Sequence, residues 1–87
     1  MSSHDRITLI REHLEQALQP DFLAIVDDSH QHKGHAGAAT GLGHFKIEIQ
    51  SHRFDTCSKV QAHRLVYEAL SSLMQTDIHA LSITIKR

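Results

Sequence analysis

The sequence predicts an α+β domain of two layers, in which two helices cover one face of a three-stranded mixed sheet. Apolar residues recur every three or four positions in residues 5–19 and 60–74, which is the spacing of an amphipathic helix. Three shorter stretches, residues 22–28, 45–50 and 78–85, are rich in the β-branched and aromatic residues typical of strands. The predicted order is helix, strand, strand, helix, strand, and packing in two layers buries every apolar surface.

The first predicted helix, residues 5–19, presents one apolar stripe, formed by Ile7, Ile10, Leu14, Ala17 and Leu18. Ser3 or Asp5 can cap its first turn, and Pro20 ends it because proline disfavours helical geometry in the residue before it. A β-favouring run follows at residues 22–28 and closes on two aspartates, which favour a turn.

The segment from residue 30 to 43 is predicted to be a flexible loop rich in histidine and glycine. It holds all 4 glycines of the chain and three histidines, His30, His32 and His35, with almost no side chain that can pack. A loop of this length is unusual in so small a domain, and long loops are commonly functional or mobile.

The second strand is predicted most clearly, because Phe45, Ile47 and Ile49 alternate with polar residues. We expect it to pair antiparallel with the first strand across the loop, and parallel with the third through the crossover helix. Phe54 is expected to hold the intervening turn against the core. In the third strand, His79 falls on the same face as the apolar residues, so it is predicted to point toward the core as a structural histidine.

The size and composition of the chain limit its function. Its 87 residues allow one domain, taken as residues 1–87, without room for a second core. No apolar run approaches the length of about 18 residues expected of a membrane span, and no secretory signal is recognised, so a cytoplasmic location is expected. Cys57 is the only cysteine, which excludes an intrachain disulfide. A net charge of −1 argues against DNA binding by phosphate neutralisation.

Four separated segments resemble the BolA family. They are D-D-S-H-Q-H-K-G-H-A-G at residues 27–37, H-F-K-I-E-I-Q-S-H-R-F at 44–54, A-H-R-L-V-Y-E-A-L at 62–70 and I-H-A-L-S-I at 78–83. The resemblance implies an αββαβ domain similar to the type II KH fold, with a short helical turn at about residues 56–60 before the main helix.

The same resemblance implies a partner and a cofactor. Proteins of this family bind monothiol glutaredoxins and share a two-iron two-sulfur cluster with them. The glutaredoxin supplies a cysteine and a bound glutathione, and the BolA side supplies one histidine from the main helix and one histidine or cysteine from the loop between the first two strands. By position these match His63 and His32, while His30 and His35 are less favoured. No cofactor is expected in the isolated chain, and the free protein is expected to be a monomer or a weak homodimer.

The bare residue types leave other interpretations open. His63 lies in the first turn of its helix, at the border of the apolar stripe, where it suits either a metal ligand or a partly buried hydrogen-bonding histidine. The three loop histidines suit weak binding of zinc, nickel or copper, and equally a solvated loop. His44 is expected on the solvated face of the sheet, opposite Phe45.

Three cations, Arg53, Lys59 and Arg64, are predicted to bind the partner through glutathione carboxylates or acidic residues. A DNA-binding transcriptional regulator would use the same patch, although residues 55–60 contain no G-x-x-G clamp. A stand-alone histidine-loop metal carrier is a further alternative. No nucleophile with a base and no carboxylate pair in a plausible cleft is recognised, so no enzymatic activity is expected.

Overall fold

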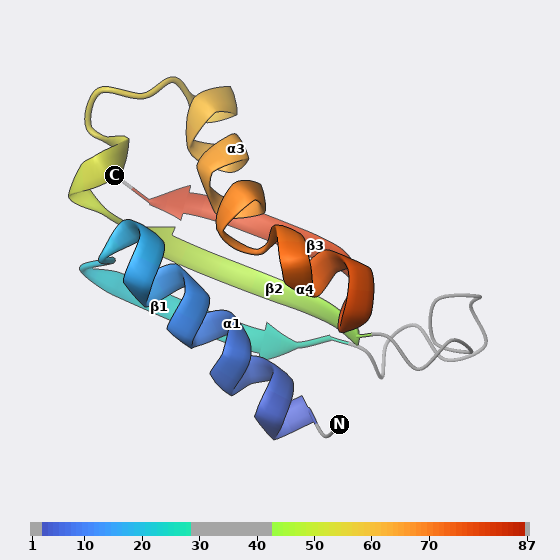
Figure 1. Cartoon of the computed structure of the whole chain (residues 1–87). Helices are drawn as coiled ribbons and strands as arrows, with labels where there is room; N and C mark the ends of the chain where they lie inside the picture. The colour runs from blue at the N-terminus through green and yellow to red at the C-terminus, as the bar shows by residue number, and fades with distance from the viewer. Residues whose placement is uncertain (1–2, 29–42, 87) are drawn as a thin grey trace.

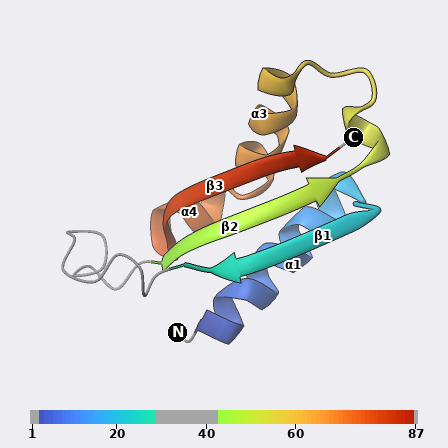
Figure 2. The same cartoon turned by 180° about the vertical axis from the view of Figure 1, so that it is seen from behind.

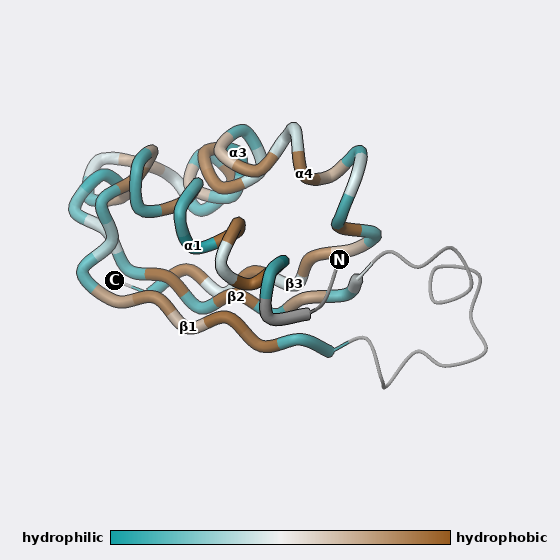
Figure 3. Tube along the Cα trace, turned by 60° about the horizontal axis from the view of Figure 1, so that its bottom comes forward, coloured by the Kyte–Doolittle hydropathy of each residue, from teal (hydrophilic) through white to brown (hydrophobic). Residues whose placement is uncertain are grey.

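A computed structural model describes residues 3–28 and 43–86 of the chain (Figure 1). Its elements follow in the order α1 (Ser3–Leu18), β1 (Phe22–Asp27), β2 (Gly43–Gln50), η2 (His52–Phe54), α3 (Lys59–Ala69), α4 (Ser71–Thr76) and β3 (Ile78–Lys86). The sheet order is β1-β2-β3, with β1 antiparallel and β3 parallel to β2. Figures 2 and 3 show the helices on one side of the sheet and the other face uncovered. The predicted α+β fold is confirmed.

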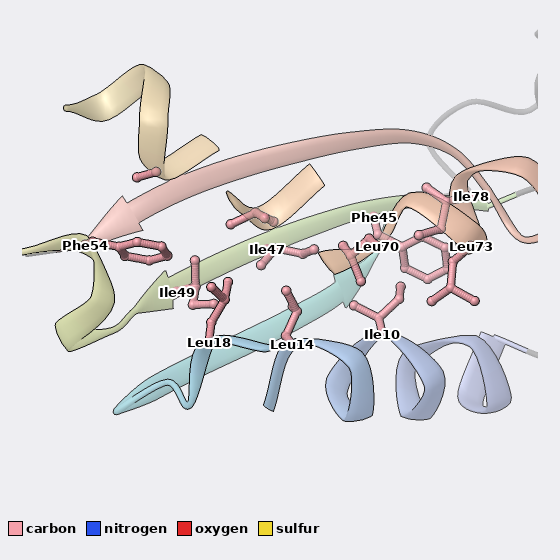
Figure 4. Close-up of a cluster of buried hydrophobic side chains, with 12 residues drawn as sticks. Ile10, Leu14, Leu18, Phe45, Ile47, Ile49, Phe54, Leu70, Leu73 and Ile78 are labelled. Atoms are coloured by element: carbon pink, nitrogen blue, oxygen red, sulfur yellow. The ribbon is translucent and has the colours of Figure 1, made fainter. Parts of the chain in front are cut away.

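The hydrophobic core fills the space between the helices and the sheet (Figure 4). The apolar stripe of α1 enters it through Ile10, Leu14 and Leu18, and alternate residues of β2 meet them, as the strand period of two requires. Phe54 is only 1% exposed, so it does hold its turn against the core. The stripe in residues 60–74 also faces inward, through Ala62, Val66, Leu70 and Leu73.

The second helical segment is two helices rather than the single one predicted over residues 60–74. α3 begins after Ser58, whose hydroxyl accepts the N–H of Gln61 while the Gln61 side chain accepts the N–H of Ser58. The helix stops at Leu70, which leaves helical geometry with φ −106° and ψ 8°. Two serines follow, and serine competes with the helix for backbone hydrogen bonds. The change of direction brings α4 round to β3 (Figure 1).

The short helical turn expected at about residues 56–60 lies earlier in the chain. It is η2, which begins after Ser51. The buried Ser51 hydroxyl donates to the carbonyl of Leu18 at 2.5 Å and accepts the N–H of Arg53 at 3.1 Å. These bonds tie the end of α1 to the start of η2, so tertiary contact rather than local sequence decides where the turn forms.

The expected core position of His79 is wrong, because β3 contains a bulge. Gly43 pairs with Ile78, but the next residue of β2, His44, pairs with Ala80, so His79 is an extra residue. The bulge shifts the alternation by one position: Ile78 is 0% exposed and His79 is exposed. Beyond it, the apolar residues of β3 pack on the core as expected.

Two further expectations at this end of the sheet change. Gly43 is the first residue of β2 instead of the last residue of the loop, and the rest of the predicted loop lies outside the described residues. His44 lines a hollow with Lys46 and Ser82, side chains that face away from the helices. However, His44 is only 9% exposed, so it is buried rather than solvated.

Candidate functional site

His63 lies on α3 and is half-buried, at the border position predicted for it. Its Nδ1 lies 2.9 Å from the carbonyl oxygen of Lys59, one helical turn earlier. Its Nε2 lies 3.2 Å from the carbonyl oxygen of Ile83 in β3. The ring therefore joins the start of α3 to the edge strand of the sheet.

This geometry restricts what His63 can do. A neutral imidazole carries one N–H, so it donates to one of the two carbonyls, and only the imidazolium donates to both. A metal ion needs a nitrogen that carries no proton and points toward the metal. With Nδ1 and Nε2 both directed at backbone oxygens, His63 must turn out of this arrangement before it can coordinate iron.

His79 is placed quite differently, on the bulge at the start of β3. It is exposed, and its ring centroid lies 5.0 Å from that of His44, with the ring planes inclined at 51°. Beside them, the N–H of Asp28 donates to the carbonyl of His44 at 2.7 Å. We call His44 and His79 the sheet-end histidine pair. The pair offers two imidazoles at one end of the sheet, and one of them is exposed.

The sheet-end histidine pair lies where the histidine-rich segment is attached. That segment joins Asp28 to Gly43, which pairs with Ile78, the neighbour of His79. The carbonyl that His63 contacts belongs to Ile83, four residues farther along β3, which is about 13 Å at the rise of a strand. His30, His32 and His35 lie outside the described residues, but their points of attachment are next to His79 and remote from His63.

The two imidazoles of the sheet-end histidine pair are suitable ligands for iron, but they supply only part of a coordination sphere. Neutral imidazole is a good ligand for iron and zinc, and two-iron clusters with histidine ligands are known. Within residues 3–28 and 43–86, no three or more histidine, cysteine, aspartate or glutamate side chains come together as a metal site. The two imidazoles alone do not complete the four ligands of a tetrahedral metal.

The three predicted cationic residues are all exposed, and they lie on two elements and on different sides of α3. Arg53 lies in η2, while Lys59 and Arg64 lie five positions apart on α3, which separates them by about 140° around the helix axis. Arg64 lines a shallow groove whose other residues are Thr56, Cys57, Gln61, Leu65 and Glu68. Neither Arg53 nor Lys59 lines this groove. The structure therefore brings Arg64 close to the half-buried Cys57 and leaves Lys59 on the side of His63.

Comparison with known proteins decides the family. Residues 14–87 match the family described as BolA-like protein. The chain belongs to the BolA family. It is 41% identical over 85 residues to Protein BOLA1, chloroplastic, of Arabidopsis thaliana, covering 94% of this chain and 53% of that protein. With BolA-like protein 1 of Mus musculus it shares 44% identity over 77 residues, covering 88% and 54%. The chain thus spans about half the length of these relatives.

Solved structures agree with this assignment. The BolA domain of SufE1 from Arabidopsis thaliana superposes with a TM-score of 0.82 at 41% identity, covering 99% of this chain and 93% of that one. The solution structure of BolA1 from Mus musculus gives a TM-score of 0.71 at 43% identity, covering 91% and 62%. The resemblance inferred from four sequence segments is confirmed. In the part of the BolA-family chain that the structure describes, no helix has the length and apolar character needed to cross a bilayer.

Proposed function

We propose that this BolA-family chain is a non-enzymatic adaptor that binds a monothiol glutaredoxin and shares a two-iron two-sulfur cluster with it. Its role is in cluster assembly, cluster trafficking or iron regulation. The observation that best supports the proposal is the exposed imidazole of His79, 5.0 Å from that of His44, at the attachment of the histidine-rich segment. The partner supplies the remaining ligands, a cysteine thiolate and the thiolate of glutathione.

The choice between His63 and His79 rests on the contacts around each of them, whereas His32 is carried over from the resemblance. His32 stays the proposed loop ligand, with His30 and His35 as its alternatives. For the second ligand the resemblance indicated His63, but both of its ring nitrogens face backbone carbonyls. The exposed ring of His79 favours that residue instead.

The other parts of the proposal follow from the sequence. Arg53, Lys59 and Arg64, all exposed, are proposed to contact glutathione carboxylates or acidic residues of the glutaredoxin. Residues 1–87 are proposed to act as a single domain in the cytoplasm, as a monomer or weak homodimer when free. No cofactor is expected without the partner.

The test is to mix the purified chain with a cluster-loaded monothiol glutaredoxin and glutathione, and to record visible circular dichroism. A new spectrum is expected with the unmodified chain, with His63→Ala and with His52→Ala, an exposed histidine that serves as the matched control. It should be lost with His79→Ala. Loss with His63→Ala and retention with His79→Ala would return the ligand role to His63. Absence of any new spectrum with the unmodified chain would contradict the proposed function itself.

A DNA-binding transcriptional regulator is the second candidate, because two relatives carry that description. The DNA-binding transcriptional regulator BolA of Escherichia coli is 38% identical over 74 residues, covering 85% of this chain and 68% of that protein. If this function applies, affinity for duplex DNA falls steeply with salt, and replacing Lys59 or Arg64 with alanine lowers both the affinity and the salt dependence. Stable zinc or nickel binding by the isolated chain would instead favour the stand-alone metal carrier.

A further inference from the structure

The outer edge of β3 presents backbone groups that point away from the sheet. The N–H of Asp28 donates to the carbonyl of His44 in β2. Backbone groups alternate along a strand, so the even-numbered residues of β2 hydrogen-bond to β1, and the odd-numbered residues direct their N–H and C=O groups toward β3. In the parallel register of β2 and β3, the even-numbered residues of β3 form the backbone hydrogen bonds with these odd-numbered residues of β2. Leu81, Ile83 and Ile85 therefore direct their N–H and C=O groups outward. The contact of His63 with the Ile83 carbonyl agrees with this direction.

Helix α3 overhangs this edge, as Figures 1 and 2 show from both sides. The bond from His63 to Ile83 identifies the side of α3 that meets it. Helical spacing places Tyr67 one turn after His63 and Val60 one turn before, displaced toward the solvent. Tyr67 is 42% exposed and Val60 is 61% exposed, so both side chains are accessible to a partner. The β3 ledge, as we call it, consists of Val60, His63, Tyr67, Leu81, Ile83 and Ile85.

Charge at one end of the β3 ledge indicates the kind of partner. Lys59 is exposed one turn before His63, whereas Lys86, the last residue of β3, is already paired with Glu48, its Nζ lying 3.1 Å from the carboxylate. The N-terminus of α3, with its partial positive charge, lies at the same end. Acidic residues in an extended partner segment are complementary to Lys59 and to the N-terminus of α3.

We propose that the β3 ledge binds an extended acidic segment of a partner protein by strand addition. The segment pairs with the outward backbone groups of β3, and its alternate side chains contact Val60 and Tyr67. In the free protein, His63 blocks the edge of β3 against pairing with another strand. Its Nε2 lies 3.2 Å from the Ile83 carbonyl, which is the acceptor for an N–H of the partner segment. This inference uses neither the cluster nor the proposed ligands His32 and His79, and it shares only Lys59 with the proposed function.

The test is nuclear magnetic resonance of the full chain with an octapeptide of alternating glutamate and valine, blocked at both ends. Its binding should slow hydrogen exchange of the Leu81, Ile83 and Ile85 amides by at least about tenfold. Methylating the backbone nitrogens of the valines in one peptide, and of the glutamates in another, should abolish binding in only one of the two, because one set of N–H groups faces β3. Binding by both, or by neither, would overturn strand addition.

Three further outcomes would also overturn the proposal. Equal binding of a lysine and valine octapeptide would remove the argument from charge. Protection of β1 amides instead of β3 amides would place the peptide on the wrong edge. Protection of β3 that rises with protein concentration, without peptide, would identify a second copy as the occupant.

Variants of the exposed residues Val60 and Tyr67 keep the test independent of folding, and the half-buried His63 is compared with a half-buried control. Val60→Glu and Tyr67→Glu should each weaken binding of the acidic octapeptide by at least about tenfold, since each places a like charge on the ledge. His63→Ala should strengthen binding, because it removes the competitor for the Ile83 carbonyl. The matched control is His13→Ala, which removes an equivalent contact of Nδ1 with a helix carbonyl, that of Leu9 at 2.8 Å, and should leave binding unchanged. Weaker binding with His63→Ala would contradict the protecting role.

Discussion

His63 and His79 are the two alternatives for the second proposed cluster ligand, beside the loop histidine, and their surroundings differ. His63 lies on a regular helix, yet both ring nitrogens meet backbone carbonyls. His79 lies in a strand whose alternation predicted a core position, yet a bulge turns it outward. The comparison shows that availability of an imidazole depends on the backbone groups around it more than on its position in a helical or strand pattern.

The largest expected effect is the difference in stability between alanine variants of Ile78 and of its neighbour His79. Ile78→Ala removes a fully buried side chain and should lower the free energy of unfolding by about 2–5 kcal/mol. His79→Ala should change it by less than about 0.5 kcal/mol, because His79 is exposed. Urea denaturation of both variants measures the difference. Equal destabilisation would mean that the bulge is misplaced and that His79 packs inside after all.

The glycine opposite the bulge should be nearly as sensitive. A Cβ at Gly43 would overlap the ring of Phe45, which is 2% exposed and cannot move without disturbing the core. Gly43→Ala should therefore cost about 1–3 kcal/mol, as overpacking does. The measurement is again denaturant unfolding, with the exposed Ala17→Gly as a control outside this region. An unchanged stability would show that the pairing of Gly43 with Ile78 is looser than described.

The next effect concerns cluster retention rather than folding. If His79 is the ligand, His79→Ala should reduce retention of the shared cluster by at least about tenfold, equivalent to about 1.4 kcal/mol, while His63→Ala should not. Anaerobic titration of the cluster-loaded glutaredoxin with each variant, followed by visible absorbance, gives the two affinities. Equal loss in the two variants would end the distinction between these histidines.

The smallest effect tests the hydrogen bonds of His63. His63→Ala should lower the free energy of unfolding by about 0.5–1.5 kcal/mol, because the half-buried ring joins α3 to β3. His13→Ala, which loses only a contact within its own helix, should cost less. Thermal unfolding by circular dichroism provides the comparison. A larger loss for His13 would indicate that the bond to Ile83 contributes little.

Much of the fold could be predicted because its signals are local. The alternation of Phe45, Ile47 and Ile49 with polar residues predicts β2, since a strand turns successive side chains to opposite faces. The stripe of α1 and the proline after it predict that helix in the same way. The family could also be predicted from the sequence, since four short segments have the order and spacing that are typical of the BolA family. The accessibility of the candidate ligands could not be read, because it depends on residues far apart in the chain.

The sequence by itself determined the element order, the face that each regular element buries and the membership of the BolA family. Only the tertiary structure decided the bulge that exposes His79 and the bond that ties His63 to Ile83, 20 residues away. The physical reason is that local periodicity sets which side chains share a surface. Register between strands, and contact between a helix and a sheet edge, arise only when the whole core packs.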